Sequence, residues 1–430
     1  MKPTDISAPD YFHKVVDCQW ACPAHTPVPH YIRLIAEGRY NEAYMVNWEA
    51  NVFPGILGRT CDRPCEPACR RGRVDKEPVA ICRLKRAAAD FKGDIRPLLP
   101  KPAGRWNGKR IALVGGGPAS LTAARDLAPL GYRCVVFDRD PKAGGMMRTR
   151  IPRFRVPEAV LDEEMGYVLD LGVEYRGGVN VASLKALLAE DWDAVFIGAG
   201  APRGLDLELP GRRAGAAHIH IGTDWLASVS FGHIGRIGER VVVIGGGNTA
   251  MDCARSARRL GGRDVHVVAR SPFAEMKAAP WEKEDVRREG IAIHDNLVPK
   301  EFIADDGRVT SVIFQPVRAV YQDGRRQLIP TGAPLEPFPC DDVILGVGQE
   351  PAFPWIERDL GVAFDDRGLP KVDPRTLQST HTKVFFGGDA AFGPKNIITA
   401  VAHGHEAAIS IDFFLRGADV TQRPAPAVSL

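Results

Sequence analysis

The chain has 430 residues, of which 45% are hydrophobic and 25% charged, and its net charge at neutral pH is +3. This composition is ordinary for a globular protein of several domains, and the near-neutral charge gives no support to nucleic-acid binding. No apolar run approaches the roughly 20 residues of a membrane helix, and the N-terminus lacks the apolar core of a signal peptide. We therefore expect a cytoplasmic protein that neither binds nucleic acid nor enters a membrane.

The first 104 residues differ from the rest, because they are rich in cysteine and show no alternation of strands and helices. Six of the nine cysteines lie here: Cys18, Cys22, Cys61, Cys65, Cys69 and Cys82. In a reducing cytosol, clustered cysteines are typical of metal or iron–sulfur ligands rather than of disulfides. Helices are expected over 31–38 and 80–91, and the proline-rich segment 97–104 is expected to be a linker.

Two glycine-rich dinucleotide-binding fingerprints follow, at 115–120 and 245–250. Each comes after an apolar run that is typical of a strand and opens a segment with helical periodicity, which is the context that the motif requires. The first glycine of such a loop allows a tight turn. The second lets backbone N–H groups approach a pyrophosphate at the helix N-terminus. Two loops in one chain indicate two cofactors, most often a flavin and a nicotinamide.

The expected strands indicate that one nucleotide-binding domain interrupts the other. They lie at 110–114, 134–137, 194–197, 241–244, 265–268, 343–345 and 384–386, and a helix is expected over 397–411. The second of these strands is followed by Asp138, 23 residues after the first fingerprint glycine. A carboxylate at this place accepts hydrogen bonds from a ribose. The last strand runs into Gly387-Gly388-Asp389 and returns the chain to the first domain.

Several linked motifs resemble those of the flavoprotein family of the glutamate synthase small subunit, whose module is also similar to the N-terminal part of dihydropyrimidine dehydrogenase. The motifs lie at 58–66, 115–120, 144–155, 245–252 and 387–389, and the resemblance covers about 18–414. It implies an α/β fold with two Rossmann-like domains after a small helical iron–sulfur domain. The implied limits are 1–104 for the iron–sulfur domain, 105–235 and 338–418 for an FAD domain, 236–337 for the NAD(P)H domain inserted in it, and 419–430 for a tail.

The resemblance also implies which residues hold the two nucleotides. The expected FAD residues are Gly115, Gly117, Pro118 and Ala119 in the first loop, Asp138 at the adenosine ribose, Gly145, Met146 and Arg148 near the flavin, Gly388 and Asp389 at the ribityl chain, and Gly200. The expected residues for the nicotinamide nucleotide are Gly245, Gly247, Asn248, Thr249, Arg270 and Gly348.

The cysteine pattern departs from that of family members with two [4Fe–4S] clusters, which need eight thiolates. Six cysteines favour one [4Fe–4S] cluster, and motif matching gives Cys22, Cys61 and Cys65 as ligands. The family takes the fourth ligand from the position of Lys85, which cannot ligate as an ammonium. Cys82 lies one helical turn earlier on the same face and is the expected fourth ligand, with Cys69 and then Cys18 as weaker alternatives. Zinc, or no metal at all, remains the other possibility, because four thiolates suit either metal.

The choice of nucleotide depends on the segment 269–273, which follows the second strand of the inserted domain. In NADPH-using members of the family, several arginines in this segment clamp the 2′-phosphate, and a bidentate arginine is the preferred partner of a phosphate. In this chain the segment contains a single arginine, Arg270. We therefore predict that NAD(H) is preferred over NADP(H).

Together these features predict a diaphorase subunit, an oxidoreductase that exchanges electrons between NAD(H), FAD and the iron–sulfur centres of a partner in a larger complex. Candidate partners are a glutamate synthase large subunit, a hydrogenase, a ferredoxin-fed reductase or an aldehyde oxidoreductase. The alternatives are a free-standing NAD(P)H:ferredoxin reductase, the glutamate synthase small subunit itself, and a non-catalytic flavin-bound assembly or redox-sensor protein. Basic residues between Arg70 and Arg86, Lys85 among them, form either a docking site for an acidic partner or an ordinary solvated surface.

Overall fold

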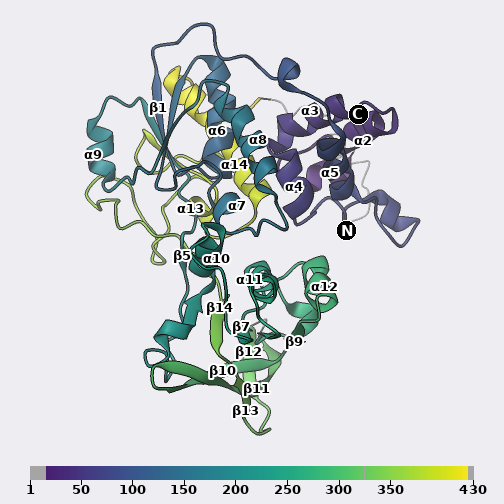
Figure 1. The fold of residues 1–430 in the computed structure, drawn as a ribbon. Coiled ribbons are helices and arrows are strands. Elements are labelled where there is room, and N and C mark those ends of the chain that lie inside the picture. The colour runs from purple at the N-terminus through teal and green to yellow at the C-terminus, as the bar shows by residue number, and fades with distance from the viewer. Residues whose placement is uncertain (1–15, 324, 425–430) are drawn as a thin grey trace. The chain divides into compact units, whose positions relative to one another are not determined.

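The computed structural model describes residues 16–323 and 325–424 and divides the chain into two compact units (Figure 1). The first unit contains the described residues before 149 together with 153–201 and those from 351 onward, and the second contains 149–152 and 202–350. The second unit is thus an insertion in the first. The expected fold class, two Rossmann-like domains after a helical domain, is confirmed. The narrower limits expected for the nucleotide domain, 236–337, stay a prediction.

The first unit begins with a small helical domain. Its helices are α1 (Asp17–Ala21), α2 (Val28–Ala36), α3 (Tyr40–Asn51), α4 (Pro54–Thr60) and α5 (Ile81–Phe91). Tyr31, Leu34 and Ala88 are at the centre of its apolar core. Helices α4 and α5 approach closely because Gly58 has no side chain, since a Cβ atom there would lie 2.7 Å from the Cα of Arg86.

The rest of the first unit is built on a five-stranded parallel sheet in the order β16-β4-β1-β2-β3. Its strands are β1 (Arg110–Val114), β2 (Arg133–Asp138), β3 (Glu174–Gly177), β4 (Ala194–Ile197) and β16 (Val384–Phe386). Its larger helices are α6 (Pro118–Leu127), α8 (Glu158–Leu169), α9 (Leu184–Ala189) and α14 (Ile397–Leu415). Helix α14 lies along α6 (Figure 1), and Gly404 permits this contact, because a Cβ atom there would lie 2.6 Å from the carbonyl oxygen of Ala119.

Buried polar contacts join the helical domain to this sheet domain. Glu164 of α8 accepts hydrogen bonds from the N–H groups of Gly55 and Ile56 at 2.6 and 3.0 Å and from the hydroxyl of Tyr44 at 2.8 Å. It therefore satisfies the first N–H groups of α4, which have no partner within their own helix. Arg125 of α6 stacks on the ring of Trp48, with its guanidinium carbon 3.9 Å from the ring centroid.

The second unit contains a second five-stranded parallel sheet, in the order β6-β14-β7-β8-β9. Its strands are β6 (Ile219–Ile221), β7 (Arg240–Ile244), β8 (Asp264–Val268), β9 (Ala292–His294) and β14 (Asp342–Leu345). Its helices are α10 (Gly222–Ser230), α11 (Asn248–Arg259) and α12 (Pro280–Arg288). An antiparallel sheet of β10 (Leu297–Asp305), β11 (Arg308–Gln322), β12 (Arg325–Pro330) and β13 (Glu336–Pro339) completes the unit, with the short pair β5 (Arg203–Gly204) and β15 (Gln349–Glu350).

Candidate functional site

Four of the six N-terminal cysteines gather inside the helical domain. Cys22 ends α1, Cys61 ends α4, Cys65 lies in the loop that follows, and Cys82 is in the first turn of α5. All four are buried, with exposed fractions between 2 and 6%, whereas Cys18 and Cys69 are partly exposed. The backbone brings two of them together, because the carbonyl of Leu57 accepts hydrogen bonds from the Cys61 N–H at 3.0 Å and from the Cys82 thiol at 3.3 Å.

The thiols of Cys22, Cys61, Cys65 and Cys82 are close enough to interact electrostatically, and we call this group the cysteine pocket. Contact between the thiols of Cys61 and Cys82 lowers the pKa of Cys82 and, together with burial, raises that of Cys61, because the pair holds one negative charge more easily than two. Burial raises the pKa of Cys65 to about 12, and the Lys85 cation acts against that rise. The four thiols therefore have Lys85, a buried cation, as a common neighbour.

The cysteine pocket is suited to a cluster of thiolate-bound iron. Its donors are soft sulfur atoms that are shielded from water, which are the ligands that iron–sulfur clusters use. In the described part of the chain, no three His, Cys, Asp or Glu side chains are arranged to hold a single metal ion. The remaining pair, Cys18 and Cys69, interact with each other, since the negative charge of Cys69 adds to burial in raising the pKa of Cys18.

Four of the basic residues beside this pocket form ion pairs within the helical domain. Arg70 and Arg73 both pair with Asp17, Arg71 pairs with Asp75, and Arg86 pairs with Asp90. The suggestion that Lys85 belongs to an exposed basic surface is wrong, because its side chain lies on the buried face of α5 and only 4% of the residue is exposed. The sequence pattern did not reveal this, since Lys85 lies between the cations Arg83 and Arg86.

The first glycine loop has the form of a phosphate-binding turn between β1 and α6. Gly115 has φ +97°, and a Cβ atom there would lie 2.6 Å from the carbonyl oxygen of Gly198. Asp138, at the end of β2, is buried and accepts hydrogen bonds from the N–H groups of Gly116 and Asp140. The carboxylate thus lies against the loop, where a ribose would be held. Sequence reasoning overlooked Gly198, although it begins the glycine-rich end of β4.

The segment expected near the flavin packs directly on this loop. A Cβ atom at Gly145 would lie 2.8 Å from the Cα of Gly117, and the Gly144 N–H donates to the Gly116 carbonyl at 2.8 Å. Arg148 is buried, but its guanidinium is engaged within the protein. Its Nε donates to the carbonyl of Ala143 at 2.6 Å, and its other nitrogens pair with Glu158 and Asp162. Arg148 therefore anchors the segment that carries Gly145 and Met146.

The C-terminal part of the chain reaches the same place. Gly388 has φ +62°, and a Cβ atom there would lie 3.2 Å from the Cβ of Ala119 in the first loop. Asp389 follows at the start of α13 (Asp389–Phe392), and burial raises the pKa of its carboxyl group. His403 of α14 accepts the Gly388 N–H at 3.1 Å, a role that sequence reasoning missed. Gly200 has φ +69°, and among the described residues only its chain neighbours can lie within 4 Å of its Cβ position.

The second glycine loop, between β7 and α11, has the same construction. Gly245 has φ +150°, and a Cβ atom there would lie 2.2 Å from the carbonyl oxygen of Gly346. Gly247 caps α11, with open space at its Cβ position. Asn248 accepts the Ala279 N–H at 2.9 Å. Gly346 therefore lies against the loop. Gly348 lies beside Leu205 instead, and its carbonyl accepts a hydrogen bond from the Leu205 N–H.

A second arginine lies at the end of β8, beside the expected Arg270. Arg326 comes from β12 and donates to the Ser271 hydroxyl at 3.0 Å and to the Arg270 carbonyl at 3.3 Å. It also faces Glu275, with 3.7 Å between the Arg326 Nε and a carboxylate oxygen. Arg326 is more than 50 residues from Arg270 in the chain, so local motif matching had no signal for it.

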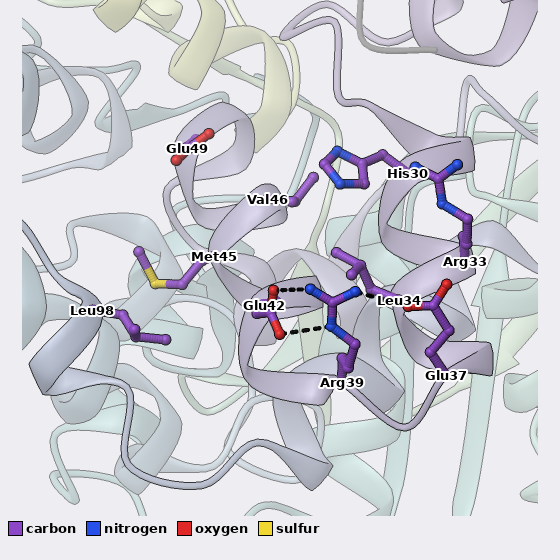
Figure 2. Close-up of a pocket in the computed structure, with 10 residues that line it drawn as sticks. All are labelled: His30, Arg33, Leu34, Glu37, Arg39, Glu42, Met45, Val46, Glu49 and Leu98. Carbon is purple, nitrogen blue, oxygen red and sulfur yellow. Dashed lines mark hydrogen bonds and ion pairs between the residues drawn. The ribbon is translucent and has the colours of Figure 1, made fainter.

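A hollow of 610 Å³ opens on α2 and α3, beside Leu98 (Figure 2). Charged side chains line much of it, and Arg39 is bound by Glu42 at 2.7 Å and by Glu37 at 2.9 Å. None of the expected cofactor or cluster residues is among its lining residues. This hollow is therefore separate from the nucleotide loops and the cysteine pocket.

Two family models together match most of the chain. Residues 109–404 match the pyridine nucleotide-disulphide oxidoreductase family, and residues 12–95 match domain II of dihydropyrimidine dehydrogenase, which carries a 4Fe-4S cluster. The chain belongs to the pyridine nucleotide-disulphide oxidoreductase family. It is an NAD(P)H-dependent oxidoreductase with an FAD/NAD(P)-binding part and a 4Fe-4S domain.

Relatives in this family agree with the resemblance stated from the motifs. The chain is 36% identical to the NADP(+)-dependent formate dehydrogenase subunit beta of Moorella thermoacetica, over 93% of this chain and 60% of that protein. It is 32% identical to the NADPH-Fe(3+) oxidoreductase subunit beta of Geobacter sulfurreducens, over 96% and 66%. It is also 32% identical to the glutamate synthase [NADPH] small chain of Mycobacterium tuberculosis, over 95% and 87%. The chain therefore spans less than two thirds of the first two relatives.

Solved structures share the fold. FprA of Mycobacterium tuberculosis, solved in complex with NADPH, matches 72% of this chain and 85% of its own with a TM-score of 0.61 and 19% identity. Lactococcus lactis thioredoxin reductase matches 72% and 99%, with a TM-score of 0.57 and 22% identity. Within the described residues, no helix combines the length and the apolar character needed to cross a bilayer.

Proposed function

We propose that the chain is the flavin-containing subunit through which electrons pass between a pyridine nucleotide and the iron–sulfur centres of a partner oxidoreductase. The observation that carries the proposal is the buried cysteine pocket in a domain that is tightly docked on the flavin-binding fold. When bound, FAD exchanges a hydride with the nucleotide and single electrons with iron–sulfur centres. Relatives that are named as beta subunits or small chains support the role of a subunit.

In this proposal the first unit holds FAD on three converging segments. The N–H group at Gly117 binds its pyrophosphate together with the N-terminus of α6, where Pro118 and Ala119 begin the helix. Gly115 forms the tight turn, because its own N–H donates to the Phe137 carbonyl at 2.8 Å. Asp138 accepts hydrogen bonds from the adenosine ribose, and Asp389 accepts them from the ribityl chain. The convergence of Gly145 and Gly388 on this loop supports the assignment, because each approaches it too closely to tolerate a side chain without rearrangement.

The cysteine pocket takes one cluster, with Cys22, Cys61, Cys65 and Cys82 as the ligands. Burial of these four thiols supports the choice over the more exposed Cys18 and Cys69. The domain that holds them is fixed to the flavin domain by Glu164 and by Arg125 on Trp48. A fixed separation between the two centres suits one-electron transfer, since no domain movement is then required between the two redox centres.

For the nucleotide, Arg326 alters the expectation that was based on the segment 269–273. With Arg270, it supplies two guanidinium groups at the end of β8, where the 2′-substituent of the adenosine ribose is recognised. The relatives named above carry NADP in their names, which supports the same choice. We therefore propose that NADPH is used at least as efficiently as NADH, rather than the NAD(H) preference predicted from Arg270 alone.

The partner is an iron–sulfur subunit, of the kind expected from the sequence. Because much of the basic run is neutralised by Asp17, Asp75 and Asp90, we do not assign docking to that run. The formate dehydrogenase relative adds a formate-oxidising enzyme to the candidate complexes named from the sequence.

The test is an anaerobic titration of the purified protein with NADPH and then NADH, followed by visible absorbance and EPR. We expect bleaching of the flavin bands, a reduced-cluster signal, and about four iron atoms and four sulfides per chain. Cys82→Ser should abolish the cluster signal, whereas Cys69→Ser, its control, should retain it. A protein that stays yellow with both nucleotides would contradict the proposal and favour an assembly or sensor role. Zinc in place of iron would contradict the cluster assignment alone.

A further inference from the structure

Lys85 lies on a helix face where an apolar residue would be expected. The buried positions of α5 are Ile81, Cys82, Lys85, Ala88 and Ala89, so the lysine is in line with the face that packs on the domain core. Only 4% of Lys85 is exposed. A lysine is rarely buried to this extent without a partner of opposite charge, because removing an ammonium from water is costly.

The countercharge of Lys85 is the cysteine pocket. Within 16–323 and 325–424, no Asp or Glu oxygen lies within 4.0 Å of its ammonium, and the nearby charged pair Arg63 and Glu66 bind each other at 3.8 Å. Cys82 lies one turn earlier on the same buried face of α5, and Cys22, Cys61 and Cys65 also interact electrostatically with Lys85. The buried ammonium is therefore a close neighbour of the sulfur atoms proposed as cluster ligands.

We propose that Lys85 is a fixed counter-charge of the iron–sulfur site, retained in the pocket to raise its reduction potential. This inference rests on the proposed function, since it requires a cluster on Cys22, Cys61, Cys65 and Cys82. Four thiolates give such a site a net negative charge, and one-electron reduction adds one more.

The sign of the effect follows from electrostatics. A fixed positive charge stabilises the reduced site more than the oxidised site, and in a buried pocket water screens this interaction weakly. Lys85 therefore makes the site easier to reduce by a flavin. Arg83, on the same helix next to Cys82, carries the same charge on an exposed position, where water and salt screen it.

The experiment compares Lys85→Leu, Lys85→Arg and Arg83→Leu with the wild-type holoprotein. Iron and sulfide are assayed first, and the midpoint potential of the cluster is then measured by EPR in an anaerobic redox titration with mediators. For Lys85→Leu we expect the ratio of reduced to oxidised cluster at a fixed potential to fall at least tenfold, a shift of about 59 mV to more negative values. For Lys85→Arg and Arg83→Leu we expect changes of less than threefold.

Each outcome decides the matter. A loaded Lys85→Leu protein with an unchanged potential would overturn the proposal, and so would an equal shift in Arg83→Leu. If the Lys85→Leu protein binds no cluster, a cluster in Lys85→Arg supports the role of the positive charge at this position. Loss of the cluster in both variants overturns the proposal. A wild-type protein without iron and sulfide would refute the cluster itself, a failure of the proposed function that is distinguishable from the others.

Discussion

The joint between the helical domain and the flavin-binding sheet domain offers a prediction with a defined energy. Asp126 of α6 pairs with Arg125 at 2.6 Å and with the Nδ1 of His405 on α14. The other ring nitrogen of His405 lies 3.0 Å from the carbonyl oxygen of Ala50, so the protonated imidazole donates on both sides. This chain of contacts ties the C-terminal helix to the end of α3.

The size of the contribution can be worked from the ionisation of Asp126. Burial acts to raise its pKa, but His405 and then Arg125 outweigh burial and lower it from 3.8 to about 2. At about 1.36 kcal/mol per pH unit, this difference corresponds to roughly 2.5 kcal/mol of stability at neutral pH. Asp126→Asn should therefore lower the free energy of unfolding by about 2 kcal/mol.

The pH dependence has a definite sign. The folded pKa of Asp126 lies below its unfolded value, so its contribution is present above about pH 4 and is lost as the pH falls through about 2. The pKa of His405 is raised, chiefly by Asp126 against the effect of burial, so its contribution is present below about pH 6.5 and is lost as the pH rises through the folded value. The difference between the wild type and Asp126→Asn should therefore shrink at alkaline pH.

Urea unfolding at pH 6.5 and 9 measures this difference, and hydrogen exchange of the amides at the end of α3 shows whether the joint itself has loosened. The control is Asp359→Asn, because Asp359 pairs with Lys185 on the surface and should contribute less than about 1 kcal/mol. If Asp126→Asn unfolds at the same urea concentration as the wild type at pH 6.5, or if its deficit persists unchanged at pH 9, the argument fails.

Two further variants test the nucleotide sites. Asp138→Ala should weaken the binding of FAD to the apoprotein about tenfold, because one charge-assisted hydrogen bond to the ribose contributes about 1–2 kcal/mol. Fluorescence titration measures the dissociation constant of FAD. A value within twofold of the wild type would count against the ribose role of Asp138. Arg326→Met should lower kcat/KM for NADPH about tenfold and leave kcat/KM for NADH nearly unchanged, since only NADPH carries the 2′-phosphate. Equal losses with both nucleotides in steady-state assays would instead indicate a structural role for Arg326.

Local sequence determined much of the fold. Apolar runs predicted the ends of β1, β2, β4, β7, β8, β14 and β16 to within about one residue. Buried parallel strands need such continuous apolar segments. The need for glycine at 115 and 245 was also evident from the sequence motifs. The structure gives the reason, because the carbonyl groups of Gly198 and Gly346 leave no room for a side chain there. The two-cofactor family followed from the same motifs.

Tertiary structure alone decided which distant groups share a site. Arg326 reaches Ser271 through the β11–β12 pairing, Gly388 meets Ala119 through the return of the chain to the first sheet, and Lys85 turns into the cysteine pocket rather than to the surface. None of these contacts leaves a local pattern, because each depends on how far-apart segments pack. Sequence thus determined the elements and the chemical class of this protein, whereas packing decided which charges face its cofactors.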